Sequence, residues 1–255
     1  MDPQTAQPGY LKRWSLLALD LILRHPIVWA AMICFYFGFA LLCANNQYLT
    51  FSFSPLTITG SLLLTISMQI VALSDTYKIN VQNFLQSIYD GVKVFIQIVR
   101  RDKFIQFVFF IFLFLDCFFS IYKNSAGAKS QVSETLRAFF ILANSLTWSY
   151  MVMLGGSKFR IFNAFIIKKA DSVDDVTFSA IEATCTKAEQ KNKVFSFQLN
   201  LIFIIFILLK YIVPYLFLFL VPFLPAFLYV AYREIFEGMD KNQKQMQVKR
   251  VLGLA

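Results

Sequence analysis

The sequence predicts an all-α, polytopic membrane helix bundle that crosses a lipid bilayer about six times. Apolar residues make up 58% of the 255 residues and charged residues only 15%, whereas a soluble domain has about 45–50% and about 25%. The apolar residues gather in long blocks, and a spanning helix needs about 20 of them in succession. A soluble protein needs a polar exterior to stay dispersed, so this much apolar surface indicates a bilayer.

Six apolar blocks have the length of a spanning helix. We expect spans at about residues 26–44, 55–73, 104–122, 136–154, 195–212 and 214–232. Pro26, Pro55 and Pro214 stand at the first turn of three of them, where the missing N–H costs nothing. Pro222 and Pro225 fall inside the sixth, and because each removes a backbone hydrogen bond we expect that helix to be kinked or locally broken. Such a break either lines a cavity or is a simple packing kink.

The basic residues are divided unequally between the two sides of this arrangement. The N-terminal segment, the connections after the second and fourth spans, and the tail together carry 20 Lys and Arg, and the opposite side carries 4. Because Lys and Arg stay on the cytoplasmic side, we expect both termini in the cytoplasm, an even number of spans, and the cell inner (cytoplasmic) membrane as the location. The formal net charge of +9 suggests anionic lipid headgroups as partners of the cytoplasmic loops.

An amphipathic stretch precedes each pair of spans. Residues 10–24 place charges on one helical face, and residues 81–103 carry one apolar stripe at spacings of three and four. In the third connection Asp174 or Asp175 is placed to cap a helix. The apolar stripe of that helix consists of Phe178, Ile181, Cys185 and Ala188. We therefore expect three amphipathic cytoplasmic-face helices, which either lie in the headgroup plane or cover the cytoplasmic ends of the bundle.

The chain divides into a single transmembrane domain over residues 1–237 and a polar cytoplasmic tail over residues 238–255. The tail is rich in Asn, Gln and Lys, and we expect it to be mobile or weakly helical. The first apolar stretch is interrupted by Asp20, and no small-residue cleavage site follows it. The first span is therefore expected to act as its own insertion signal.

Asp116 is the residue that most invites a functional interpretation. It lies within the third predicted span, where a carboxylate is costly and marks a functional candidate. With Asn144 in the fourth span and Asn200 in the fifth, it forms a candidate intramembrane polar site. Three interpretations remain open: a structural acid that is protonated or hydrogen-bonded to a neighbouring helix, a proton- or solute-binding group, or a residue at the outer interface.

Aromatic and basic residues mark the first entry into the membrane. Trp14, Trp29 and Arg24 suit the interfacial belt, where amphipathic rings and long cations sit at the level of the headgroups. His25 follows directly, but no nucleophile or metal partner is visible for it in the sequence, so we do not expect a catalytic role.

The motifs of several function classes are missing from the sequence. Four cysteines without a CxxC pair and a single histidine argue against zinc or iron–sulfur sites, so we expect no metal and no cofactor. The HExxH and GxSxG signatures, paired membrane aspartates and a Walker loop are absent, so we do not expect an enzyme. No basic run carries interleaved aromatics or a recognisable module, so nucleic acid is not an expected partner.

Two segments of the sequence resemble a known group of proteins. The entry Leu21–Trp29 reads LILRHPIVW and the exit Pro222–Phe236 reads PFLPAFLYVAYREIF. Together with Ser179–Ala183, they resemble uncharacterised bacterial inner-membrane proteins of YciC-like layout, which have about six spans. The resemblance implies a bacterial cytoplasmic-membrane protein without an established activity, and no functional residue is carried over from it. The chain lacks the high Ala and Gly content of many members of that group. A related membrane domain lies beside some glycerophosphodiester phosphodiesterase domains, which implies a link to lipid or envelope metabolism.

The sequence favours a multipass membrane protein without catalytic activity, an envelope or membrane accessory or assembly factor. Its partners would be lipids, another protein or a second copy of the chain. The basic loops and the three expected cytoplasmic-face helices support this hypothesis. The alternative is a small-solute transporter or channel that uses Asp116. A lipid-modifying enzyme is a third hypothesis, and it would need polar groups that converge at one membrane depth.

Overall fold

The structure, a computed structural model, describes residues 2–44, 53–76, 80–123, 134–154, 158–168, 174–213 and 215–238. Within these ranges the backbone forms ten α-helices and one 3-10 helix, and it forms no strand. The all-α fold class predicted from the sequence is therefore confirmed.

The first two helices are joined by one residue. Helix α1 covers Tyr10–Arg24 and α2 covers Pro26–Ala44, with His25 between them. α2 begins with Pro26, as predicted for a first-turn proline. The Nε2 atom of His25 lies 3.1 Å from the carbonyl oxygen of Ser74, so this side chain connects the joint to the end of the next helix.

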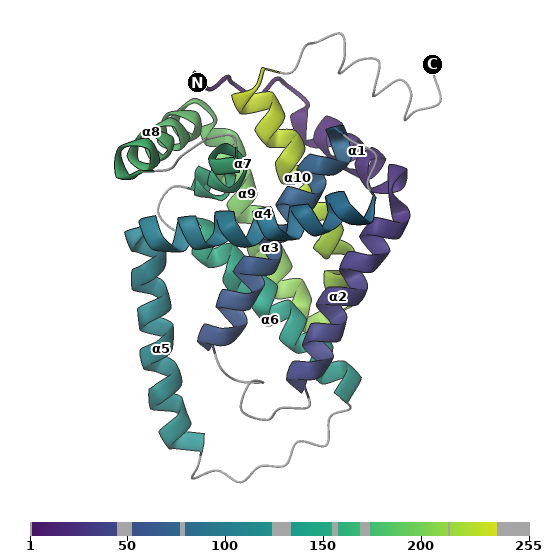
Figure 1. Cartoon of the computed structure of the whole chain (residues 1–255), viewed down its shortest axis with the longest axis vertical. Helices are drawn as coiled ribbons and strands as arrows, with labels where there is room; N and C mark the ends of the chain where they lie inside the picture. The colour runs from purple at the N-terminus through teal and green to yellow at the C-terminus, as the bar shows by residue number, and fades with distance from the viewer. Residues whose placement is uncertain are drawn as a thin grey trace.

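Helices α3 (Phe53–Thr76) and α6 (Glu134–Leu154) pack closely in the middle of the bundle (Figure 1). A Cβ atom at Gly60 would overlap the hydroxyl groups of Ser145 and Ser149. The two backbones can therefore approach because position 60 has no side chain. Small residues have this role wherever helices pack inside membranes, because lipid does not push helices together as water does.

Helix α4 (Val81–Arg101) crosses α3, and α5 (Lys103–Lys123) turns from its end and runs along the side of the bundle (Figure 1). Asn80 caps α4, because its side-chain oxygen accepts a hydrogen bond of 2.7 Å from the backbone N–H of Asn83. At the crossing, a Cβ on Gly91 would lie only 2.6 Å from the Cα of Ile66 in α3. α4 can therefore touch α3 only because Gly91 has no side chain.

Two short helices form a buried block at one end of the bundle. They are η2 (Lys158–Phe162) and α7 (Asn163–Lys168). All residues from Phe159 to Ile167 are buried except Arg160. This basic and apolar segment, which follows the fourth predicted span, is thus part of the core.

Helix α8 (Asp175–Lys191) begins as the sequence predicted. Asp174 is its N-cap, and the carboxylate accepts a hydrogen bond of 2.7 Å from the backbone N–H of Thr177. Bonding to Thr177 lowers the pKa of Asp174 below its ordinary value. The predicted stripe of Phe178, Ile181, Cys185 and Ala188 is buried, so both the cap and the stripe of this helix are confirmed.

Helices α9 (Lys193–Ile212) and α10 (Leu216–Phe236) complete the bundle. α10 is helical through Pro222 and Pro225, so the local break that the two prolines suggested is not present. Most of its side chains from Leu220 onward are buried, and packing on several sides stabilises a helix that lacks two backbone hydrogen bonds.

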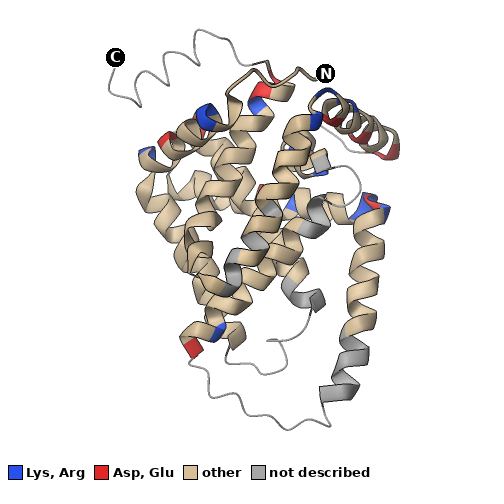
Figure 2. Ribbon diagram, turned by 180° about the vertical axis from the view of Figure 1, so that it is seen from behind, with Lys and Arg blue, Asp and Glu red and all other residues tan. Residues whose placement is uncertain are grey.

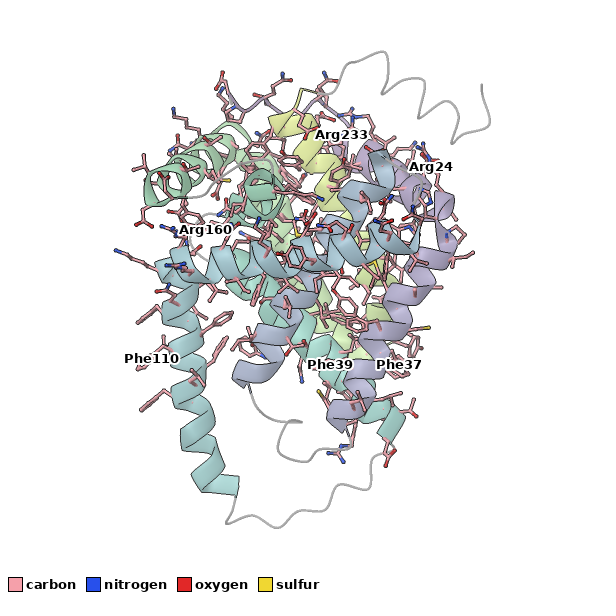
Figure 3. All side chains as sticks on the ribbon, viewed as in Figure 1. Arg24, Phe37, Phe39, Phe110, Arg160 and Arg233 are labelled. Atoms are coloured by element: carbon pink, nitrogen blue, oxygen red, sulfur yellow. The ribbon has the colours of Figure 1, made fainter. Side chains whose placement is uncertain are left out.

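The charged residues gather at one end of the molecule. Figure 2 shows Lys, Arg, Asp and Glu around α1, α8, the end of α10 and the joint between α4 and α5. The opposite part of the described bundle carries few charges, with Glu134 and Arg137 at the start of α6. In Figure 3 Arg160 and Arg233 lie in the charged part, whereas Phe110 on α5 points away from the bundle. We call the two parts the charged end and the apolar body.

Three helices have the length and apolar composition of a membrane span within the described residues. They are Pro26–Ala44, Thr57–Asp75 and Leu216–Phe236. The other three predicted spans, 104–122, 136–154 and 195–212, coincide with α5, α6 and α9. The helices expected from the sequence are therefore present. Among the described residues, three of them are long and apolar enough to cross a membrane.

Candidate functional site

Three buried carboxylates organise the charged end. The exposed fractions of the side chains are 11% for Asp75, 1% for Asp102 and 3% for Glu234. Each lies at or beside the end of an apolar helix, and each pairs with an arginine from a distant part of the chain. A buried carboxylate without a partner would be very unfavourable, so these three pairs determine how the helices meet.

Glu234 joins α10 to α1. Its two carboxylate oxygens lie 2.6 and 2.8 Å from Nη2 of Arg13. The indole N–H of Trp14 donates a 2.8 Å hydrogen bond to Oε2, and the backbone N–H of Gln7 donates one of 3.0 Å to Oε1. One charged pair and two further donors therefore satisfy this buried acid.

The N-terminal segment is fixed to the same region by backbone bonds. The N–H of Gln4 donates a 2.7 Å hydrogen bond to the carbonyl of Ile235. Asn192, between α8 and α9, accepts from the N–H of Ala6 at 2.7 Å and donates to the carbonyl of Gln4 at 3.0 Å. The first residues of the chain thus connect the ends of α8, α9 and α10.

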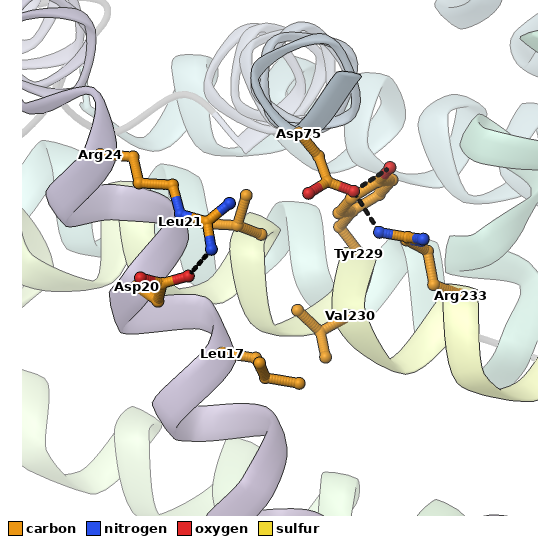
Figure 4. A pocket seen from close by; sticks show the side chains of 8 residues that line it. All are labelled: Leu17, Asp20, Leu21, Arg24, Asp75, Tyr229, Val230 and Arg233. Atoms are coloured by element: carbon orange, nitrogen blue, oxygen red, sulfur yellow. Dashed lines mark hydrogen bonds and ion pairs between the residues drawn. The ribbon is translucent and has the colours of Figure 1, made fainter. Parts of the chain in front are cut away.

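Asp75 joins α3 to α10. Its Oδ2 atom accepts a hydrogen bond of 3.2 Å from the phenol of Tyr229 and forms an ion pair with Arg233 (Figure 4). Arg233 and Glu234 are neighbours in sequence, yet one contacts α3 and the other α1. The end of α10 therefore links both helices through two adjacent, oppositely charged residues.

A small cavity lies between α1, α3 and α10 beside this pair. Its volume is about 20 Å³, which is enough for about one water molecule. Its charged lining consists of Asp20, Arg24, Asp75 and Arg233, and Asp20 pairs with Arg24 across one turn of α1 (Figure 4). Two acids balance two bases, so the cavity has the size and charge of a hydrated ion-pair cluster and cannot enclose an organic solute.

Asp102 occupies the joint between α4 and α5. Its Oδ1 atom accepts hydrogen bonds from the N–H groups of Phe104 at 2.9 Å and Ile105 at 3.1 Å, which caps α5. The same atom lies 3.0 Å from Nη1 of Arg160 in η2. Arg160 also lies 3.1 Å from Glu182 in α8. Burial raises the pKa of Glu182, and Arg160 acts in the opposite direction.

An aromatic core lies beneath these ion pairs. The ring of Trp14 meets that of Phe195 edge to face, with centroids 4.9 Å apart. Phe165 stacks on Tyr232 at 5.0 Å, and Phe162 lies 5.5 Å from Phe236. Such pairs add about 0.5–1.5 kcal/mol each beyond their buried area, so they help to hold α1, η2, α7, α9 and α10 together.

A row of polar side chains, the α3 polar stripe, runs along α3 in the bundle interior. Thr57, Ser61, Thr65 and Gln69 recur every four residues, and all four are buried. The amide of Gln69 donates a 2.7 Å hydrogen bond to the carbonyl of Ala164. Within the described part of the chain, Ser61 Oγ and Gln69 Oε1 have no hydrogen-bond partner.

The predicted intramembrane site is only partly visible. Asp116 lies in α5, but its side chain is outside the described residues. Asn144 in α6 and Asn200 in α9 are both half-buried. A meeting of the three side chains therefore stays a prediction.

The predicted membrane anchors have specific protein partners. Trp14 is fully buried and bonds Glu234, and Trp29 is 2% exposed and donates a 3.3 Å hydrogen bond to the carbonyl of Leu21. Arg24 pairs with Asp20. Their level relative to a bilayer interface stays a prediction.

Sequence reasoning missed the three organising acids. Glu234 and Arg233 were noted only within the exit segment, and Asp75 and Asp102 were not singled out. A usable signal was present, because each acid lies two residues from a long apolar block, where an unpaired carboxylate would be costly.

These observations define a class of protein. Three apolar helices long enough to cross a bilayer place the chain among the helical membrane proteins. Comparisons with protein-family models, curated proteins and solved structures gave no match. In the described residues, no three His, Cys, Asp or Glu side chains cluster in a way that could hold a metal ion.

Proposed function

We propose that the chain is a six-span protein of the bacterial inner membrane with both termini in the cytoplasm. It acts without catalysis, as an accessory or assembly factor that binds lipid or protein partners. The observation that carries this proposal is the division into an apolar body with exposed apolar side chains and a charged end closed by buried ion pairs.

The exposed surfaces of α5 and α9 support six spans. Phe107, Phe110 and Phe114 of α5 are 61%, 69% and 66% exposed. On α9 the exposed apolar side chains are Val194, Phe197, Leu201, Ile204, Ile205, Leu208 and Ile212. Water-facing helices rarely keep such continuous apolar surface, whereas lipid-facing helices require it.

The position of the charged end supports the orientation. The ion pairs formed by Arg13, Arg160 and Arg233 all lie at the charged end. The N-terminal segment is hydrogen-bonded to the end of α10 there. Both ends of the described chain are therefore on one side of the apolar body. An excess of Lys and Arg on that side favours the cytoplasm.

The geometry of the charged end supports a binding role over catalysis or transport. Its acids are engaged by arginines and helix N–H groups, and the cavity beside Asp75 has room for about one water. The outer surface of this region, rather than the small cavity beside Asp75, is therefore where partners would bind.

One pair of measurements tests this function. Deletion of the gene is expected to increase entry of a membrane-impermeant dye into cells, and the wild-type gene is expected to restore the barrier. Purified protein in vesicles that contain a pH-sensitive dye is expected to leave an imposed proton gradient unchanged. A barrier unaffected by deletion, together with protein-dependent dissipation of the gradient, would reject the accessory role.

The α3 polar stripe favours one second candidate, a small-solute or proton pathway that includes Asp116. Buried polar atoms without partners, such as Ser61 Oγ and Gln69 Oε1, are sites where water molecules bind. In the vesicle assay this candidate predicts proton flux that Asp116→Asn abolishes. Ser61→Ala should slow the flux, and Ser87→Ala in α4 serves as the control.

A further inference from the structure

Helix α4 contacts the bundle along one face. Its buried residues are Ser87, Gly91, Val94 and Ile98, which recur at spacings of four, three and four and so form one line along the helix. Gly91 lies against the backbone of Ile66. Phe84, Ile88, Val92, Phe95 and Val99 are half-buried and also pack against the core, but the apolar side chains on the far side of α4 are not covered.

An exposed apolar line runs along α4 on roughly the opposite side of the helix from this face. It consists of Val81, Leu85, Tyr89 and Ile96, which are 77%, 59%, 63% and 57% exposed. Successive members are four or seven residues apart, so they share one side of the helix. Phe107 and Phe110 on α5, the helix that follows directly, are also exposed. Exposed apolar side chains therefore occur both on α4 and on the α5 surface that we assign to lipid.

Three cations border this line. Lys93 follows Tyr89 by four residues, Arg100 follows Ile96 by four, and Lys103 begins α5. Residues four apart are neighbours on a helix surface, so cations and apolar side chains alternate along one edge. All three cations are exposed, and none has an ion-pair partner in the described residues.

The nearby acids are engaged elsewhere. Asp90 lies 3.4 Å from Lys168 and accepts a 2.9 Å hydrogen bond from Gln86. Asp175 pairs with Arg101, and Asp102 is buried with Arg160. Among the described residues, no acid therefore neutralises the positive charge along the edge of α4.

We infer that α4 lies in the interfacial plane of the cytoplasmic leaflet and binds an anionic phospholipid there. The acyl chains lie against Leu85, Tyr89 and Ile96, and the phosphate group is held by Lys93, Arg100 and Lys103. An apolar face bordered by Lys and Arg has the chemistry of an interfacial helix. This inference rests on the proposed membrane embedding and adds a specific lipid site to it.

Fluorescence quenching tests the position of α4. The full chain is reconstituted in nanodiscs whose lipids carry brominated acyl chains, and an added tryptophan is compared with the parent protein. Leu85→Trp on the apolar line should be quenched, and Gln86→Trp on the polar side should not. Phe110→Trp on α5 is the reference for embedding.

Lipid retention tests the charges. Native mass spectrometry would count phosphatidylglycerol molecules that remain bound after extraction from mixed phosphatidylglycerol and phosphatidylcholine membranes. The triple variant Lys93→Gln, Arg100→Gln, Lys103→Gln should reduce the affinity by roughly a hundredfold, because each cation near an anionic surface contributes about fivefold. The matched control removes three other exposed cations, Lys12, Lys187 and Lys193, and should retain the lipid.

The two proposals fail in different ways. If Phe110→Trp is quenched and Leu85→Trp is not, the lipid site on α4 is refuted while the membrane embedding stands. Equal lipid loss in both triple variants, or crosslinking of Leu85→Cys to a second copy or another protein, also refutes the site. If Phe110→Trp itself is unquenched, the proposed embedding fails.

Discussion

Removal of the charge on Glu234 is the perturbation with the best-defined effect on stability. Glu234→Gln keeps the size of the side chain but leaves Arg13 without its partner. The cost of breaking a buried ion pair is about 3–5 kcal/mol. Because the Arg13 side chain is 18% exposed, water screens part of its charge, and we expect a loss near the lower limit, about 3 kcal/mol.

A double-mutant cycle separates the pair from other effects. Arg13→Gln alone should also lower the free energy of unfolding by about 3 kcal/mol, because it leaves a buried carboxylate. The double variant should lose less than the sum, with a coupling of about 2–3 kcal/mol. The pair of Lys191 and Asp2 is the control. Since the side chains are 41% and 86% exposed, Asp2→Asn should leave stability unchanged within error.

The assay is a titration of the purified protein in mixed micelles with dodecyl sulfate, followed by circular dichroism. It reports the free energy of unfolding of each variant. A coupling below about 0.5 kcal/mol, the limit for independent sites, would refute the role of Glu234 as an organising acid. A loss in Asp2→Asn equal to that in Glu234→Gln would refute it as well.

Three further predictions use the same purified protein. Gly91→Ala should lower the free energy of unfolding by about 1–3 kcal/mol through overpacking. The control Gly38→Ala should not, because an added Cβ there meets nothing within 4 Å. Equal effects of the two variants would contradict the close approach of α4 to α3. Asp102→Asn keeps the α5 cap but loses the charged hydrogen bonds to Arg160. In the same titration it should lower the free energy of unfolding by about 2 kcal/mol. Burial raises the pKa of Cys185 to about 12, so at pH 8 its alkylation, mapped by mass spectrometry, should be roughly a thousandfold slower than in the denatured chain. Because the folded pKa is raised, stability should also fall as pH rises above about 9.

Local properties of the sequence predicted the helices well. The first predicted span coincides with α2 (Pro26–Ala44), and the cap and stripe of α8 are those that the spacing indicated. Apolar block length and helical spacing are local signals that need no knowledge of partners. The two prolines of α10 were misleading in one respect, because tertiary packing keeps that helix continuous.

The contacts that build the charged end could not be derived from one sequence. Glu234 and Arg13 are 221 residues apart, Arg233 and Asp75 are 158 apart, and Arg160 and Asp102 are 58 apart. Which buried acid meets which arginine depends on how helices pack, and composition or spacing does not encode it. The sequence does indicate that acids beside apolar blocks need partners.

Asp116 was chosen as a candidate site residue from the sequence alone. Its position inside a spanning block is a property of the sequence, and the structure adds that it lies in α5. Its side chain lies outside the described residues, so its role as a site residue stays a prediction.

The most direct test of the central claim is the membrane side on which each end of the chain lies. Alkaline phosphatase, which is active only outside the cytoplasm, and a fluorescent protein that matures in the cytoplasm would be fused at the N-terminus, after Ala128 and after Ala255. Six spans predict phosphatase activity only after Ala128 and fluorescence at both ends. Three spans, formed by α2, α3 and α10 alone, would place the two ends on opposite sides, and phosphatase activity at either terminus would contradict the account.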